Sequence, residues 1–181
     1  LLDRLQDALH LAARHDRMVG VLFLDHDRFK VVNDSLGHGV GDDLLREAAR
    51  RLERTIRPGD LVARLGGDEF VVVIADMVRT TDALAAAERI RTALARPVEF
   101  ETDSTVMSAS VGIAVAHGTE TPSDLLRDAD TAMYRAKEGG RDRAVMFGAH
   151  LRAQAVRRHS VEQELRSALD EDRIEVHFQP V

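Results

Sequence analysis

The sequence contains no cysteine and no tryptophan, and only one tyrosine, among its 181 residues. The lack of cysteine excludes a disulfide, a thiolate metal site and a cysteine nucleophile. This usage fits a protein that works in a reducing cytoplasm, where we expect this chain to be located. Because aromatic residues are scarce, the core must be built mainly from Leu, Val, Ala and Ile.

Long apolar runs and excess positive charge are also missing. No apolar run approaches the roughly 18 residues of a membrane-spanning helix, so we expect no membrane segment in this chain. The formal net charge of −6 disfavours a nucleic-acid backbone as a partner. What is present is 44% hydrophobic residues, enough for the core of one ordinary domain. A helical pattern already begins at Leu1, Leu2 and Leu5, which favours a segment of a longer protein.

After an N-terminal helix, the hydrophobic pattern predicts strand, helix, hairpin, helix and strand. This is the split βαβ order of ferredoxin-like folds. We therefore predict an α+β fold, an α/β sandwich whose βαββαβ core has a central, mostly antiparallel sheet flanked by helices. The helices are expected at 1–15, 28–35, 42–56, 80–95 and 122–137, and the strands at 19–24, 61–65, 70–74, 106–116 and 144–147.

This topology places carboxylates from distant segments at one sheet edge. The first two strands run parallel and the third lies antiparallel between them, so Asp25 at the end of the first strand meets the hairpin tip at Asp68 and Glu69. Like charges this close need a divalent cation or a raised pKa. Carboxylate oxygens suit Mg²⁺ or Mn²⁺, and two such ions about 3.5–4 Å apart favour attack on phosphorus. Taken alone, Asp25-x-Asp27 is more simply a solvated strand end.

The hairpin tip itself reads Gly66-Gly67-Asp68-Glu69-Phe70. With the segments described below, this pentapeptide resembles the GGDEF family, the diguanylate cyclases. The resemblance covers about residues 1–148 and implies a nucleotidyl-cyclase-like fold. It also implies a bacterial protein that condenses two GTP molecules to cyclic di-GMP and releases two pyrophosphates.

The resemblance implies a role for each acidic residue of this edge. Asp25 and Asp68 would be metal ligands, together with the backbone carbonyl of His26. Glu69 would bind metal and help to deprotonate the attacking 3′-hydroxyl, which makes Asp68 and Glu69 the implied catalytic residues. The implied cofactor is Mg²⁺ or Mn²⁺, with two ions in each active site.

Basic residues lie near the predicted metal site in two segments. Arg28, Phe29 and Lys30 begin a helix, where free backbone N–H groups form an anion site, and in the family these amides hold the terminal phosphates. Lys137 and Arg141 match the family's Lys-x-x-x-Arg pair, which grips the β- and γ-phosphates. Taken alone, the second pair is a cationic helix C-terminus stabilised by the helix dipole.

Residues 33–42 resemble the family's Asn-Asp-x-x-Gly-His-x-x-Gly-Asp stretch, whose first Asn and last Asp contact guanine. A carboxylate at Asp42 can accept both the N1–H and the N2–H₂ of guanine, and Asn33 can pair elsewhere on the purine edge. Adenine lacks this donor pair, so ATP would leave a carboxylate unpaired at a cost of roughly 1–3 kcal/mol. The structural alternative is that Asn33 is a turn residue and Asp42 a helix N-cap. Both interpretations can hold at once.

Arg57-Pro58-Gly59-Asp60 precedes the hairpin in the register of the family's product-inhibition site. There, Arg57 and Asp60 would bind cyclic di-GMP, and Arg89 in the next helix matches a further arginine of that site. A basic position found in some members is Ala85 here. The alternative is a simple turn with a weak surface ion pair.

The C-terminal part of the sequence looks different. Residues 149–170 form a charged helical pattern that we interpret as a linker. Residues 171–181 resemble the first strand of an EAL domain, the cyclic di-GMP phosphodiesterase that often follows a GGDEF domain. This resemblance implies a parent protein with both domains in tandem, in which a membrane or sensor region is compatible with this sequence. The Glu-Ala-Leu signature itself is absent, so this segment alone cannot hydrolyse the product.

The resemblance also implies the partners. One domain holds one GTP, so catalysis needs an antiparallel homodimer, and cyclic di-GMP is both product and inhibitor. The alternative is a catalytically silent GTP-binding module that controls an attached EAL phosphodiesterase. A third interpretation is a product receptor that acts through Arg57 and Asp60, although such receptors usually have a decayed pentapeptide, and this one is intact.

Overall fold

The structure is a computed structural model, and it describes residues 1–99, 104–116 and 119–148. Leu1–Phe147 form one compact unit. The predicted linker at 149–170 and the predicted EAL start at 171–181 lie outside the described residues. In the part of the chain that is described, no helix is long and apolar enough to cross a bilayer.

A five-stranded sheet lies at the centre of this unit, in the order β2-β3-β1-β6-β7. β1 pairs antiparallel with both β3 and β6, β2 pairs antiparallel with β3, and β7 lies parallel to β6. The predicted ferredoxin-like order is therefore confirmed. The main strands are β1 (Met18–His26), β2 (Leu61–Gly66), β3 (Glu69–Met77), β6 (Ala109–Ala116) and β7 (Ala144–Met146).

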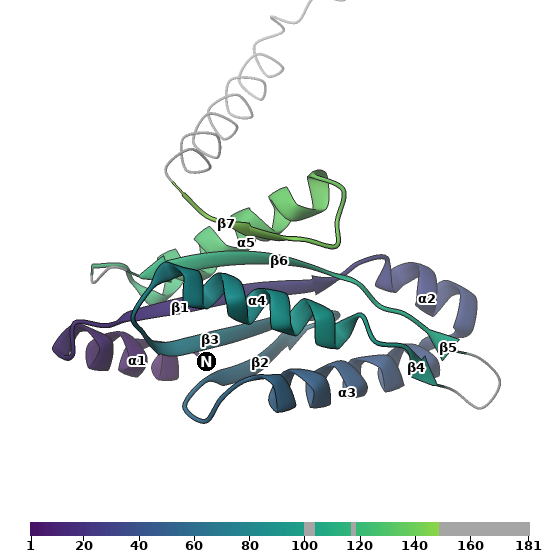
Figure 1. The fold of residues 1–181 in the computed structure, drawn as a ribbon. Helices are drawn as coiled ribbons and strands as arrows, with labels where there is room; N and C mark the ends of the chain where they lie inside the picture. The colour runs from purple at the N-terminus through teal and green to yellow at the C-terminus, as the bar shows by residue number, and fades with distance from the viewer. Residues whose placement is uncertain (100–103, 117–118, 149–181) are drawn as a thin grey trace, which may run out of the picture. The chain divides into compact units, whose positions relative to one another are not determined.

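Helices cover both faces of the sheet (Figure 1). One face packs on α1 and α5 through the buried residues Val21, Phe23 and Val71. The other packs on α3 and α4 through Leu22, Leu24 and others. β1 is buried on both sides, which explains why its sequence is a continuous apolar run. The helices are α1 (Leu2–Arg14), α2 (Phe29–Leu36), α3 (His38–Thr55), α4 (Thr80–Leu94) and α5 (Pro122–Glu138).

Gly112 in β6 lets α5 approach the sheet closely. A Cβ at this position would lie 1.9 Å from the carbonyl oxygen of Ala129 and 2.1 Å from the backbone nitrogen of Met133. No side chain fits in this space, because such distances are far below van der Waals contact. The close approach fixes the height of α5 above β6 and, with it, the position of Lys137 in the last turn of the helix.

Three predicted boundaries are wrong, and one of them is the end of β3, which lies at Met77 rather than at Ile74. α3 begins at His38 rather than at Asp42, because Gly37, with φ at +86°, breaks the chain between α2 and α3. The strand predicted at 106–116 begins only at Ala109, and a short pair that the pattern did not predict, β4 (Val98–Glu99) with β5 (Ser104–Thr105), precedes it. Apolar residues therefore continue beyond the paired strand, since Met107 is buried without belonging to a strand.

Candidate active site

The end of β1 and the tip of the β2–β3 hairpin meet at one edge of the sheet. Asp25 is paired directly with Glu69 across the two antiparallel strands, so both side chains leave the sheet on the same face. Gly67 and Asp68 form the turn, and Gly67 has a φ of +52°, a conformation that favours glycine. The predicted meeting of Asp25 with the hairpin tip is confirmed.

The Asp25 carboxylate lies in a place that disfavours its charge. Its side chain is 10% exposed, and burial raises its pKa, to which the negative charges of Asp68 and Glu69 add. The Nζ of Lys137 lies 2.6 Å from Asp25 Oδ2 and opposes this effect. Three carboxylates and one ammonium group thus interact at this edge, and a bound cation would relieve the repulsion.

This edge fits a divalent metal ion by its chemistry, because the donors are carboxylate oxygens of the kind that Mg²⁺ and Mn²⁺ prefer. Within residues 1–99, 104–116 and 119–148, no three acidic or histidine side chains are gathered closely enough to hold an ion together. The Asp25 carboxylate is instead paired with Lys137. The predicted metal roles of Asp25, Asp68 and Glu69 therefore stay predictions, as does the number of ions.

The His26 side chain turns to the opposite face of the sheet. Its ring meets the Phe70 ring edge-on, with 5.8 Å between centroids, and is almost fully buried. Burial lowers the pKa of His26, which favours the neutral imidazole. A backbone group of Ser108 lies near the ring and opposes part of this shift. The side chain is thus part of the core, and only the backbone carbonyl remains for the predicted metal contact.

Asp27 anchors the strand end, a role that the sequence did not indicate. Its carboxylate accepts hydrogen bonds from Ser108 Oγ and Ser110 Oγ, both at 2.7 Å, and from the backbone N–H of Asp142 at 3.0 Å. The strand end is therefore tied to β6 and to the turn after α5. The alternation of Ser108 and Ser110 is a sequence signal that could have suggested this contact, although it becomes meaningful only once β1 and β6 are known to pair.

The predicted phosphate-binding groups lie around the same edge. Arg28, in the left-handed region at φ 59°, precedes α2, and the first intrahelical bond runs from Val31 N–H to its carbonyl oxygen. The N–H groups of Phe29 and Lys30 come before that bond, as expected at a helix N-terminus. Arg141 is exposed, four residues after Lys137.

The two predicted guanine contacts are brought together by the packing of α2 on α3. A Cβ on Gly41 would lie 1.9 Å from Asn33 Oδ1, so only glycine leaves room for the Asn33 side chain beside Asp42. Asn33 Oδ1 is buried and has no hydrogen-bond partner among the described residues. Asp42 is exposed and lies inside α3. The alternative that Asp42 is the N-cap of this helix is therefore wrong.

Arg57 and Asp60 form a local structural contact. The Asp60 side chain is only 1% exposed and accepts hydrogen bonds from the N–H groups of Arg57 and Ala75 and from Arg57 Nε. The Arg57 guanidinium, which is half exposed, also donates to the carbonyl oxygens of Ala75 and Asp76. The motif therefore joins the turn before β2 to the far end of β3.

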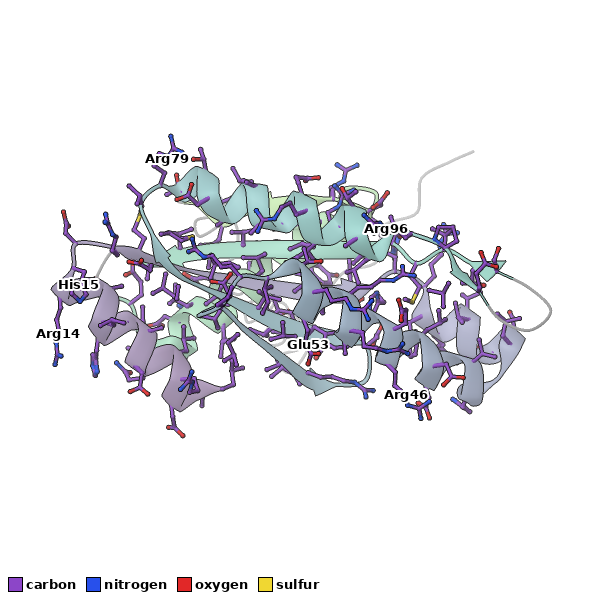
Figure 2. All side chains as sticks on the ribbon, turned by 60° about the horizontal axis from the view of Figure 1, so that its bottom comes forward. Arg14, His15, Arg46, Glu53, Arg79 and Arg96 are labelled. Carbon is purple, nitrogen blue, oxygen red and sulfur yellow. The ribbon has the colours of Figure 1, made fainter. Side chains whose placement is uncertain are left out.

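Arg89 lies on the outer side of α4, beside a surface hollow of about 530 Å³. Figure 2 shows Arg79 and Arg96 at the two ends of this helix. The hollow runs along α4 from Ala85 to Arg96, and Thr55 at the end of α3 also lines it. The lining residues are Thr55, Ala85, Glu88, Arg89, Thr92, Ala93 and Arg96.

Comparison with known proteins assigns the chain to a family. Residues 1–143 match the family described as diguanylate cyclase, GGDEF domain. The chain belongs to the GGDEF family. TpbB of Pseudomonas aeruginosa, named a diguanylate cyclase, is 46% identical over 140 residues, which cover 76% of this chain and 32% of TpbB. The solved GGDEF domain of TpbB superposes with a TM-score of 0.81 at 39% identity, over 84% of this chain and 90% of that domain.

Two other Pseudomonas aeruginosa relatives carry names with a second activity. MucR, named a bifunctional diguanylate cyclase and cyclic di-GMP phosphodiesterase, is 40% identical over 179 residues, covering 98% of this chain and 26% of MucR. NbdA, named a cyclic di-GMP phosphodiesterase, is 38% identical over 164 residues, covering 90% of this chain and 21% of NbdA. This GGDEF domain thus spans between about a fifth and a third of the length of the relatives it matches.

Proposed function

We propose that this GGDEF domain is a diguanylate cyclase, which condenses two GTP molecules to cyclic di-GMP and releases pyrophosphate. The observation that carries the proposal is the pairing of Asp25 with Glu69 beside the intact Gly66–Phe70 tip, with Lys137 at 2.6 Å from Asp25. Acidic and basic groups converge there as a metal-bound triphosphate requires. The family match and the relatives named diguanylate cyclases support the same activity.

The chain's residues divide into groups with different tasks. Asp25, Asp68 and Glu69, with the His26 carbonyl, would hold two Mg²⁺ or Mn²⁺ ions. Such ions, when bound, neutralise phosphate charge and increase the acidity of a coordinated hydroxyl. Glu69 accepts the proton of the attacking 3′-hydroxyl. Its place in a fixed antiparallel pair with Asp25 keeps its carboxylate on the reactive face of the sheet.

Phosphate and base are held by the flanking helices. Lys137, Arg141 and the first N–H groups of α2 neutralise the triphosphate, which carries about four negative charges. Asn33 and Asp42 pair with the donor edge of guanine, and Gly41 gives Asn33 the space to reach it. An adenine would leave the Asp42 carboxylate without its two donors, so the site selects GTP over ATP.

Catalysis requires two copies of the domain. Each site positions one GTP, and the 3′-hydroxyl of one nucleotide must reach the α-phosphate of the other. An antiparallel homodimer brings the two sites face to face. A monomer of this chain would therefore bind GTP without forming product.

Product feedback would act at α4. The positive charge of Arg57 is among those that lower the pKa of Asp82 in the first turn of α4, after the larger effect of the Arg79 backbone N–H. Arg89 follows Asp82 by two turns of the same helix, a rise of roughly 10 Å. The hollow beside Arg89 offers about 530 Å³ for a ligand. Because Asp60 is buried, its part is to hold the Arg57 guanidinium in place, while Arg57 and Arg89 contact the anionic product.

The decisive experiment separates synthesis from binding. The 181-residue chain, at high concentration with GTP and Mg²⁺, should form cyclic di-GMP that chromatography resolves from GTP. Asp68→Ala and Glu69→Ala should each lower the rate on the order of a thousandfold or more, because the metal and the proton acceptor are lost. Glu53→Ala, an exposed acid on α3 (Figure 2), is the matched control and should keep the wild-type rate.

A second candidate is a catalytically silent GTP-binding module that regulates an attached EAL phosphodiesterase. The relative named as a phosphodiesterase favours it, since NbdA matches 90% of this chain. Bound but unchanged GTP in the same assay would select this function. Full activity of both Asp68→Ala and Glu69→Ala would reject the mechanism proposed for the first.

A further inference from the structure

The turn that follows α5 has an unusual backbone. Gly140, Arg141 and Asp142 have φ values of +111°, +63° and +44°, so three consecutive residues lie in the left-handed region. Side-chain-bearing residues avoid this region, and two of them in sequence persist only where their surroundings hold them. Arg141, one of the two, is the residue proposed to grip the phosphates.

Two side chains from distant elements hold this turn. Asp27, at the end of β1, accepts the backbone N–H of Asp142 at 3.0 Å and is itself fixed by Ser108 and Ser110, each at 2.7 Å. On α4, Arg91 donates to Asp142 Oδ1 at 2.8 Å and to the Asp142 carbonyl oxygen. The backbone of Asp142 is thus bound at both its N–H and its carbonyl.

The contact from α4 is well fixed. The Arg91 side chain is 19% exposed, and its other terminal nitrogen lies 2.7 Å from Glu88 Oε2, so the guanidinium bridges two carboxylates. Because these two carboxylates already fix the guanidinium, Arg91 loses little further side-chain freedom when it also bonds the Asp142 carbonyl oxygen. The Arg141 N–H donates to the Ala136 carbonyl oxygen at 3.0 Å, which fixes the turn at its other end.

We propose that Arg91 and Asp27 are positioning residues for the nucleotide phosphates. They hold Gly140–Asp142 in one strained conformation and so pre-organise Arg141, next to Lys137, for the β- and γ-phosphates. This inference rests on the proposed function in one respect, namely that Lys137 and Arg141 bind those phosphates. Neither Arg91 nor Asp27 touches the nucleotide itself.

The test measures binding, with 3′-deoxy-GTP and GMP as probes in Mg²⁺, because a nucleotide without a 3′-hydroxyl cannot be turned over. Arg91→Ala should weaken 3′-deoxy-GTP roughly tenfold and GMP less than about twofold, since only the triphosphate reaches Arg141. Arg91→Lys keeps the positive charge but not the forked guanidinium. Its loss of affinity for 3′-deoxy-GTP should therefore be smaller than that of Arg91→Ala but still measurable. Arg17→Ala, which removes an arginine paired with Asp76 at the opposite end of β1, is the matched control.

Non-additivity makes the test specific. Arg141→Ala should cause a similar loss, and adding Arg91→Ala to it should cause little further loss, because the positioned group is already missing. Asp27→Asn should reproduce the selective loss and leave the Mg²⁺ midpoint unchanged, and a shifted midpoint would instead identify Asp27 as a metal ligand. Should Arg91→Ala not fold, Asp142→Ala removes the side-chain contact between Arg91 and Asp142 Oδ1 and should give a selective loss in the same direction.

The possible outcomes distinguish failure of the positioning role from failure of the proposed cyclase function. Equal weakening of 3′-deoxy-GTP and GMP, or a full additional loss in the double variant, overturns the positioning role and leaves the cyclase proposal standing. Failure of the wild-type chain to bind 3′-deoxy-GTP overturns both. A chain that binds GTP but forms no product leaves the positioning result intact, since no readout depends on turnover.

Discussion

Asp25 shows how a single residue connects the folding of this domain to its ligand. The carboxylate is buried and lies near Asp68 and Glu69, so the folded protein favours its protonated form and its pKa is raised. A folded-state pKa above the unfolded value means that this residue's contribution to stability is present below the unfolded pKa and is lost as pH rises through the folded pKa. At neutral pH, Asp25 therefore lowers the stability of the metal-free domain.

Replacing this carboxylate should separate stability from metal binding. In buffer that contains a metal chelator, Asp25→Asn should raise the midpoint temperature of thermal unfolding by about 2–5 °C at pH 7. The difference from wild type should shrink as pH falls below the folded pKa. Added Mg²⁺ and GTP should stabilise the wild type only. Asp7→Asn, which changes an exposed acid on α1, is the control and should change none of these values. A lower unfolding midpoint for Asp25→Asn than for the wild type would show that the pairing of Asp25 with Lys137 outweighs the cost of burying its charge.

Arg57 and Arg89 are both exposed, and Arg57 in addition bonds the backbone at the end of β3. Arg89→Ala should raise the inhibition constant for cyclic di-GMP about tenfold, since a charge-assisted contact to phosphate is lost. Arg57→Ala should do the same and also lower the unfolding midpoint, because its guanidinium bonds the end of β3. Initial rates with added cyclic di-GMP, each referred to the same variant without product, measure the effect. Inhibition that is unchanged in both variants would mean that Arg57-Pro58-Gly59-Asp60 is only a structural turn. Arg14→Ala, which changes an exposed arginine on α1, is the control (Figure 2).

At the scale of elements, the packing of α5 on β6 decides where the basic groups lie. The helix can pack this closely only because position 112 has no side chain. Its last turn then places Lys137 beside Asp25, and the turn after it carries Arg141. A helix lying higher on the sheet would move both basic residues away from the acids.

A methyl group in this contact should therefore reduce both stability and binding. Gly112→Ala should destabilise the domain by about 1–3 kcal/mol or more through overpacking, and should weaken GTP binding as α5 is displaced. Chemical denaturation and nucleotide titration measure the two effects. Gly39→Ala is the control, since no atom lies near its Cβ position and alanine favours the helix. Unaltered stability of Gly112→Ala would mean that α5 can shift without cost.

For the whole molecule, the proposed reaction depends on a partner of the same kind. Specific activity should rise with protein concentration, so total turnover increases faster than linearly until the dimer is saturated. Rates measured over a hundredfold dilution series, with the oligomeric state followed by light scattering, test this. A specific activity that stays constant while the protein is monomeric would contradict the requirement for a homodimer.

Much of this architecture is encoded locally. The apolar run before Asp25, the glycine-rich hairpin and the amphipathic helices identify the ferredoxin-like order, and that order alone brings Asp25 to Glu69. The helix start at His38 and the strand start at Ala109 were missed for a physical reason. Cap and strand ends depend on backbone angles and pairing, whereas the hydrophobic pattern reports burial. α3 begins at the exposed His38, before its first buried residue Gly41, and burial begins at Met107, before the paired strand β6.

The sequence by itself determined the fold class, the family resemblance and the residues that approach one another at the sheet edge, because these follow from hydrophobic period, turn chemistry and topology. Only the tertiary structure decided what those residues touch. It paired Asp25 with Lys137, buried Asp60, and tied Asp27 to the turn that Arg91 holds from α4. Such contacts depend on how closely helices and strands pack, and Gly112 and Gly41 set that distance in a way no pattern of single residues reveals.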